Sequence, residues 1–152
     1  MKKILLIYTS MSGNTESIAQ EIVNGIKRTG EEVEVLELFE VESLSLLSEY
    51  DGILLGAYTW GDGELPDEFI GFYEELNDLD LRGKVCATFG SGDTMYPQFC
   101  AAVDLLEMKL RDRGATIVQQ GLKIEFSPEG EEIEVCRMFG EQFAQKMQLV
   151  SI

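Results

Sequence analysis

The chain has 152 residues, of which 45% are apolar and 26% are charged, and this length and composition favour one globular domain spanning residues 1–152. Histidine is absent and the three cysteines have no CxxC spacing, which argues against Ser-His and Cys-His hydrolases, zinc sites, histidine-ligated metals and a disulfide framework, and we expect no metal site. The 28 acidic and 12 basic residues give a net charge of −16, which argues against nucleic acid and anionic membranes as partners because both attract clusters of Lys and Arg.

Short apolar runs alternate along the chain with longer amphipathic stretches, the order expected of a parallel sheet covered on both faces. The runs expected to form strands are residues 3–8, 32–37, 52–57, 84–89 and 116–124. Their nearly continuous apolar character is typical of strands buried on both faces. The apolar run at residues 4–8 is too short for a signal peptide or a membrane span, so we expect a soluble, cytoplasmic protein.

Apolar residues recur at helical spacing between these runs. The helices expected are residues 14–28, 67–76, 98–113 and about 131–147, with a short helix or turn at 43–48. Gly30 and Gly114 follow helices 14–28 and 98–113 as C-caps, and Pro66 and Pro97 precede helices 67–76 and 98–113. Five strands with intervening helices predict an α/β doubly wound sheet, in which right-handed crossovers restrict the strand order.

In such sheets ligands bind outside the carboxyl ends of the strands, and three loops there carry polar, glycine and aromatic residues. The first loop follows the first strand directly into a helix N-terminus, where free N–H groups favour an anion. Its residues are Thr9, Ser10, Met11, Ser12, Gly13, Asn14 and Thr15. It contains no lysine, which argues against a P-loop, so it is either a seat for a phosphate monoester or an ordinary capped helix start.

The second loop follows the third strand and contains the only tryptophan of the chain. Its residues of interest are Tyr58, Thr59, Trp60, Gly61 and Asp62. The tryptophan ring either covers one face of a planar ligand or closes over the core.

The third loop follows the fourth strand and begins Gly-Ser-Gly, but it lacks the third glycine of a dinucleotide-binding loop. Its residues of interest are Ser91, Gly92, Asp93, Tyr96, Gln98, Phe99 and Cys100. Exposed backbone amides there are suited to ring heteroatoms, and Tyr96 is placed to form a second aromatic wall.

Together these motifs give the chain a resemblance to the short-chain flavodoxins over nearly its full length. Residues 10–15 resemble the family's FMN phosphate loop, residues 59–62 its first isoalloxazine loop, and residues 90–96 its second. Flavodoxins are among the proteins that established the rule that ligands bind at the carboxyl ends of the strands, so the rule is not independent support for this resemblance. Ser12 stands where the family often has threonine, and the hydroxyl is retained.

The resemblance implies a three-layer fold with strand order 2-1-3-4-5 and noncovalently bound FMN, with Trp60 and Tyr96 on either side of the ring. Backbone N–H groups around Asp93 and Cys100 would face its pyrimidine edge. Gly61, next to Asp62, matches the peptide that flips when the flavin becomes a semiquinone, so we expect a stabilised neutral semiquinone. The implied function is a low-potential carrier of single electrons with no substrate turnover of its own.

The charges are predicted to be segregated. Ten of the twelve basic residues fall at the edge opposite the loops, namely Lys2, Lys3, Lys27, Arg28, Arg82, Lys84, Lys109, Arg111, Arg113 and Lys146, and the exceptions are Lys123 and Arg137. The acidic residues around the loops are Asp62, Glu64, Asp67, Glu68 and Asp93. We therefore expect a monomer that docks transiently, through this acidic end, on basic surfaces of a flavodoxin reductase and of acceptor redox proteins.

Two other flavoprotein functions stay open: an activator dedicated to one enzyme, of the ribonucleotide-reductase type, and a quinone reductase. The quinone reductase needs a substrate pocket over the ring, where Trp60 and Tyr96 are expected. A phospho-receiver domain is excluded because Thr9 and Thr59 follow the first and third strands where acids are needed, and Asp51 is at the wrong end. A phosphatase would need a CxxxxxR loop, which is missing.

Overall fold

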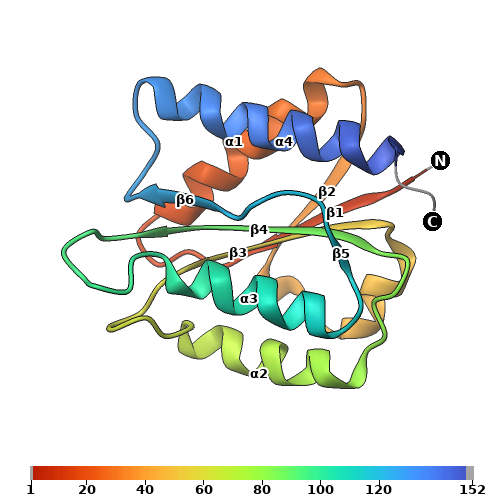
Figure 1. Ribbon diagram of the computed structural model, residues 1–152, viewed down its shortest axis with the longest axis horizontal. Helices are drawn as coiled ribbons and strands as arrows, with labels where there is room; N and C mark the ends of the chain where they lie inside the picture. The colour runs from red at the N-terminus through yellow and green to blue at the C-terminus, as the bar shows by residue number, and fades with distance from the viewer. Residues whose placement is uncertain (1, 150–152) are drawn as a thin grey trace.

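The computed structural model describes residues 2–149, which form a parallel sheet between two layers of helices (Figure 1). The strands are β1 (Ile4–Tyr8), β2 (Val33–Glu37), β3 (Gly52–Tyr58), β4 (Val85–Gly92), β5 (Thr116–Ile117) and β6 (Leu122–Glu125). Their order is β2-β1-β3-β4-β5, β6 also pairs with β4, and every pairing is parallel. The predicted doubly wound sheet with order 2-1-3-4-5 is confirmed.

The expected fifth strand at residues 116–124 is wrong in one respect, because it is divided into β5 and β6. The start of β4 pairs with Thr116 and Ile117, and its end pairs with residues 122–125, so that two residues of β4 (87–88) face four residues (118–121). Gly121 lies in this break, where a Cβ would come within 2.5 Å of Val103 Cγ1. The chain leaves the ladder here because two extra residues cannot pair and the glycine lies close against α3.

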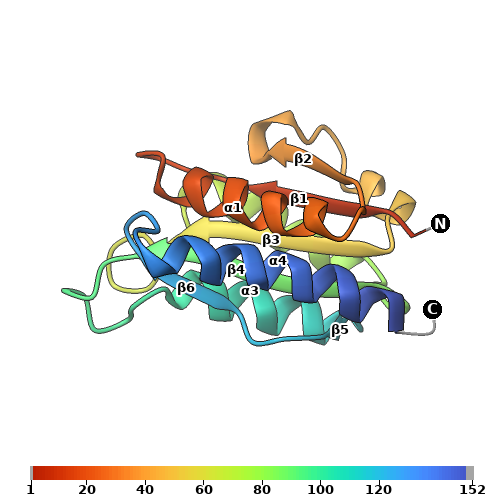
Figure 2. The same ribbon diagram turned by 90° about the horizontal axis from the view of Figure 1, so that it is seen from above.

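The helices are α1 (Asn14–Arg28), α2 (Asp67–Glu75), α3 (Ala101–Asp112) and α4 (Glu131–Leu149), with short 3-10 helices at Leu38–Glu40, Leu44–Glu49 and Leu76–Asp78. Helices α1 and α4 cover one face of the sheet, and α2 and α3 cover the other (Figures 1 and 2). The short helix expected at 43–48 is present. Helix α3 begins three residues later than expected, because Cys100 has a left-handed backbone (φ 53°) and helical geometry starts only after it.

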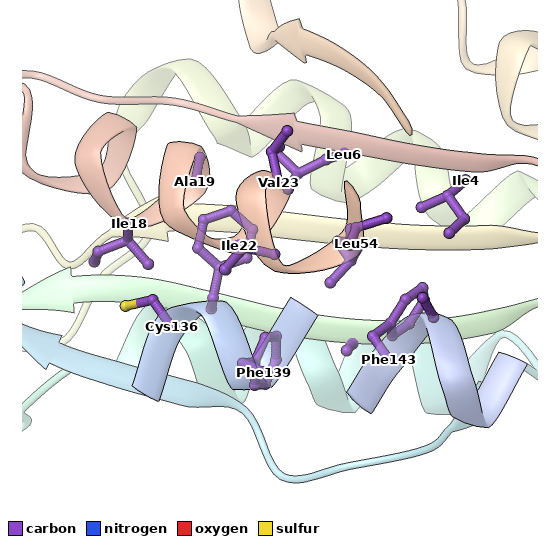
Figure 3. Packing of buried hydrophobic residues seen from close by; sticks show 14 of the residues in the cluster. Ile4, Leu6, Ile18, Ala19, Ile22, Val23, Leu54, Cys136, Phe139 and Phe143 are labelled. Atoms are coloured by element: carbon purple, nitrogen blue, oxygen red, sulfur yellow. The ribbon is translucent and has the colours of Figure 1, made fainter. Parts of the chain in front are cut away.

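The core has two layers because successive strand residues point to opposite faces of the sheet. On one face, Leu6 and Leu54 pack with Ile18 and Ile22 of α1 and Phe143 of α4 (Figure 3). On the other face, a second buried cluster joins β1, β3 and β4 to α2 and α3. No helix within residues 2–149 is long and apolar enough to cross a membrane.

Helices α1 and α4 approach each other backbone to backbone through two glycines. A Cβ added to Gly25 would lie 1.8 Å from the carbonyl oxygen of Arg137, and one added to Gly140 would lie 2.0 Å from that of Ile22. No larger residue fits either position without moving a helix. This contact fixes α1, whose N-terminus follows the first loop.

Candidate functional site

The loops after β1, β3 and β4 meet at one edge of the sheet, on the left of Figures 1 and 2, and enclose an open cleft. It is lined by Ser10, Met11, Ser12, Asn14, Thr15, Tyr58, Thr59, Gly61, Ser91, Gly92, Asp93, Tyr96, Gln98, Cys100 and Phe126. Expected site residues that do not line it are Thr9, Gly13, Trp60, Asp62 and Phe99. Phe126 lines it although the sequence reasoning missed it; its position just after the last strand was the available signal.

The first loop exposes unpaired backbone donors at the start of α1. Gly13 takes a left-handed conformation (φ 89°) as the N-cap residue. The Ser10 Oγ accepts hydrogen bonds from the N–H groups of Gly13 at 3.1 Å and Glu16 at 3.3 Å. The N–H groups of Ser12, Asn14 and Thr15 form no hydrogen bond within the described chain. These donors and the positive end of the helix dipole suit a phosphate dianion.

A buried hydrogen bond joins the first loop to the third. Thr15 Oγ1 and Ser91 Oγ are 2.7 Å apart, and both residues are almost completely buried. They are 76 positions apart in the sequence. The phosphate seat is therefore held in a fixed relation to the end of β4.

The second loop is a tight hairpin with a free tip. Trp60 and Glu64 exchange two backbone hydrogen bonds, of 2.8 and 2.9 Å, at its base. The backbone groups of Gly61 and Asp62 at the tip form no hydrogen bond within residues 2–149. Thr59 Oγ1 accepts from the N–H of Ala102 at 3.1 Å and so caps α3 from a distant segment.

Two aromatic side chains stand half-exposed beside the cleft. Trp60 is 46% exposed and Tyr96 is 48% exposed, so the tryptophan does not close over the core. The ring of Tyr58 meets that of Trp60 edge to face, with centroids 6.5 Å apart at 74°. Large exposed rings at a concave polar site are suited to cover a planar ligand.

The third loop carries Cys100 in a role that is not nucleophilic. Its side chain is fully buried, with Sγ 3.8 Å from the carbonyl oxygen of Gly90. Burial raises the pKa of the Cys100 thiol to about 12, so the sulfur is a neutral thiol at physiological pH. The same cause raises the pKa of Cys86 and Cys136 to about 12, and both are structural core residues.

Glu68 of α2 connects the ends of β1 and β3. Its Oε2 accepts from the hydroxyl groups of Thr9 at 2.9 Å and Tyr58 at 2.8 Å. Partial burial raises the pKa of Glu68, but hydrogen bonds from its own backbone, Tyr58 and Thr9 outweigh it, so the pKa lies below its usual value. The carboxylate stays charged and holds both strand ends.

Negative charge dominates this end of the molecule. No Lys or Arg is among the described residues that line the cleft. Lys123 and Arg137 are the two basic residues that are not predicted to lie at the edge opposite the loops. Both form ion pairs, Lys123 with Asp104 at 2.7 Å and Arg137 with Glu21 at 2.8 Å. The cleft combines an anion seat, aromatic side chains and acidic surroundings on an α/β fold, and these features fit the class of flavin-mononucleotide-binding α/β proteins.

Comparison with known proteins places the chain within that class. The family model described as "Flavodoxin" matches residues 6–140. The chain is 50% identical over 146 residues to "Probable flavodoxin 2" of Bacillus subtilis, covering 96% of this chain and 97% of that protein. It is 40% identical over 135 residues to a flavodoxin of Maridesulfovibrio salexigens, covering 88% and 92%. The crystal structure of oxidised Flavodoxin 1 from Bacillus cereus aligns with a TM-score of 0.91 at 49% identity, over 95% of this chain and 98% of that one.

The chain therefore belongs to the flavodoxin family. Proteins of this family bind FMN and carry electrons, as redox partners of reductases and other oxidoreductases. The predicted cofactor, FMN, and the general role of electron carrier are confirmed. The donor set of the first loop and the half-exposed rings fit this cofactor.

Proposed function

We propose that this flavodoxin is a one-domain, monomeric, low-potential carrier that takes single electrons from a reductase and passes them to acceptor enzymes in the cytoplasm. The observation that carries the proposal is the cleft itself: it lies at the edge where the three loops meet, the half-exposed Tyr96 lines it, and none of the described residues that line it is basic. Such a site leaves a flavin edge accessible to a protein partner. Transient docking on basic surfaces follows from charge complementarity.

Different loops would bind different parts of FMN. The free N–H groups of Ser12, Asn14 and Thr15 would hold the phosphate, and Trp60 and Tyr96 would flank the ring. FMN supplies the one-electron chemistry. The protein binds it, orients it and limits the access of water.

Gly61 would tune the potential of the flavin. Its peptide lies at the free tip of the hairpin, and its left-handed backbone (φ 51°) costs glycine little. A glycine peptide can turn its carbonyl toward a protonated ring nitrogen at small cost, which favours the neutral one-electron-reduced state. The nearby acids would disfavour a further negative charge and so lower the potential of the second electron.

The test is the absorption spectrum of the purified protein. Flavin bands that turn blue on partial reduction are expected, with negligible NAD(P)H:quinone activity of the protein alone. A colourless protein that takes up no added FMN would overturn the proposed function. Quinone turnover at rates typical of enzymes would instead assign a reductase. No feature of residues 2–149 favours an activator dedicated to one enzyme over a general carrier.

A further inference from the structure

We propose that Glu125, Phe126 and Ser127, which follow the edge strand β6, form a strap that sets the position of the third loop relative to the phosphate loop. The inference rests on the proposed FMN site, because these two loops would hold different parts of one cofactor. The strap consists of positioning residues. Each of these three residues forms a hydrogen bond with a residue of one of the two loops.

Glu125 holds the tip of the third loop. Its carboxylate accepts from the backbone N–H of Thr94 at 3.0 Å and from the Thr94 hydroxyl. The hydrogen bonds from the Thr94 side chain and backbone hold the pKa of Glu125 below its usual value. Both bonds are charge-assisted and therefore stronger than neutral ones.

Phe126 turns the chain between the two loops. Its N–H donates to the carbonyl oxygen of Gly92 at 3.0 Å, and its half-exposed ring lines the cleft. Its φ is +57°, a left-handed conformation that costs free energy for a residue with a Cβ. Such strain persists only where surrounding contacts impose it, and here the contacts on both sides do so.

Ser127 completes the connection. Its Oγ donates to Asn14 Oδ1 at 2.7 Å, and Asn14 is the first residue of α1 and lines the cleft. The strap is itself fixed at its start, since Ile124 and Glu125 pair with Ser91 and Gly92 of β4. Three consecutive residues thus span from the tip of the third loop to the phosphate seat.

This arrangement separates the contributions to flavin binding. Loosening the bond to Asn14 would affect chiefly the phosphate part, whereas loosening the bonds to Thr94 would affect the ring part. Riboflavin has the same ring and no phosphate, so it reports the ring part alone. Misplacement of either loop weakens binding because a pre-organised site loses its fit.

The experiment compares Ser127→Ala and Glu125→Ala in protein loaded with FMN or with riboflavin. Flavin release on serial dilution is followed by flavin fluorescence. Glu129→Ala is the matched control, because it removes one exposed acid from the same connection and the Glu129 carboxylate forms no hydrogen bond or ion pair with the described residues of either loop. Thermal unfolding is recorded for each variant.

Ser127→Ala is expected to weaken FMN binding about fivefold and to leave riboflavin within about twofold, as for the loss of one neutral hydrogen bond. Glu125→Ala is expected to weaken both flavins alike, by about tenfold, as for charge-assisted bonds.

Three results would overturn the strap. The first is FMN affinity within twofold of the unmodified protein in both variants. The second is an equal loss of FMN and riboflavin in Ser127→Ala, together with lowered thermal stability, which indicates a merely structural role. The third is an effect of Glu129→Ala as large as that of Glu125→Ala. Failure of the unmodified protein to bind FMN would overturn the proposed function and the strap together, whereas the three results above leave the proposed function intact.

Discussion

Single residues at this site act through backbone geometry as much as through their side chains. Gly61 has a left-handed φ of 51° and free peptide groups, and Cys100 and Phe126 have φ of 53° and 57° without being glycine. Cys100 places a buried thiol under the third loop, and Phe126 turns the chain toward the first. Cys100 and Phe126 both line the cleft, and their positive φ is consistent with strain being retained where a ligand is held.

Gly61→Ala is expected to move at least one of the two redox couples by more than about 10 mV, roughly 0.2 kcal/mol for one electron. The added Cβ penalises the left-handed peptide and so biases the two backbone states. A potentiometric titration of the purified protein measures both couples.

Gly30→Ala is the matched control for this variant. Gly30 has the same kind of backbone (φ 86°) with no neighbour within 4 Å of an added Cβ, and it follows α1 at the opposite edge. Gly30→Ala should lower the stability of the protein about as much as Gly61→Ala does and leave both redox couples unchanged. Unchanged couples in Gly61→Ala would contradict the role given to this peptide.

At the scale of elements, the site is held by contacts that cross between them. Thr59 at the end of β3 caps α3, and Glu68 of α2 holds the ends of β1 and β3. The close packing of α1 on α4 fixes the helix that follows the phosphate loop. Because each loop is anchored on a different rigid element, the sheet sets the distances between them.

Gly140→Ala is expected to destabilise the protein by about 1–3 kcal/mol, because the added Cβ meets the backbone carbonyl of Ile22 and overpacks the helix pair. Chemical denaturation monitored by circular dichroism measures the change. The control is Gly71→Ala in α2, where a Cβ meets nothing within 4 Å and the helix should gain about 0.5–1 kcal/mol. A neutral Gly140→Ala would show that α1 and α4 can separate at little cost.

At the scale of the whole molecule, the net charge is −16, and the basic residues are predicted to lie mostly at the edge opposite the cleft. Among the described residues that line the cleft, Asp93 is acidic and none is Lys or Arg, and Lys123 and Arg137 are paired with Asp104 and Glu21. The resulting field orients the cleft toward a basic partner at distances up to a Debye length, about 10 Å at 0.1 M salt.

Raising the ionic strength from about 0.1 M to 1 M, where the Debye length falls to about 3 Å, is expected to slow reduction by a partner reductase. Stopped-flow kinetics measure the rate. Replacing Asp62 and Glu64 by Asn and Gln should reduce this salt dependence. The same charge change at Glu74 and Glu75, exposed at the far end of α2, should leave it nearly unchanged. A salt-independent rate would rule out steering.

The sequence by itself determined the sheet, its helices and the three loops, because these depend on local signals: apolar periodicity, glycines and the positions of strand ends. Only the tertiary structure decided how the loops are held. The Thr15–Ser91 bond, the Thr59 cap of α3 and the contacts of residues 125–127 join residues far apart in the chain. The division of the last strand likewise follows from pairing with β4 and from packing against α3 at Gly121. Such contacts have no local signature, since they arise only when the sheet brings distant strand ends to one edge.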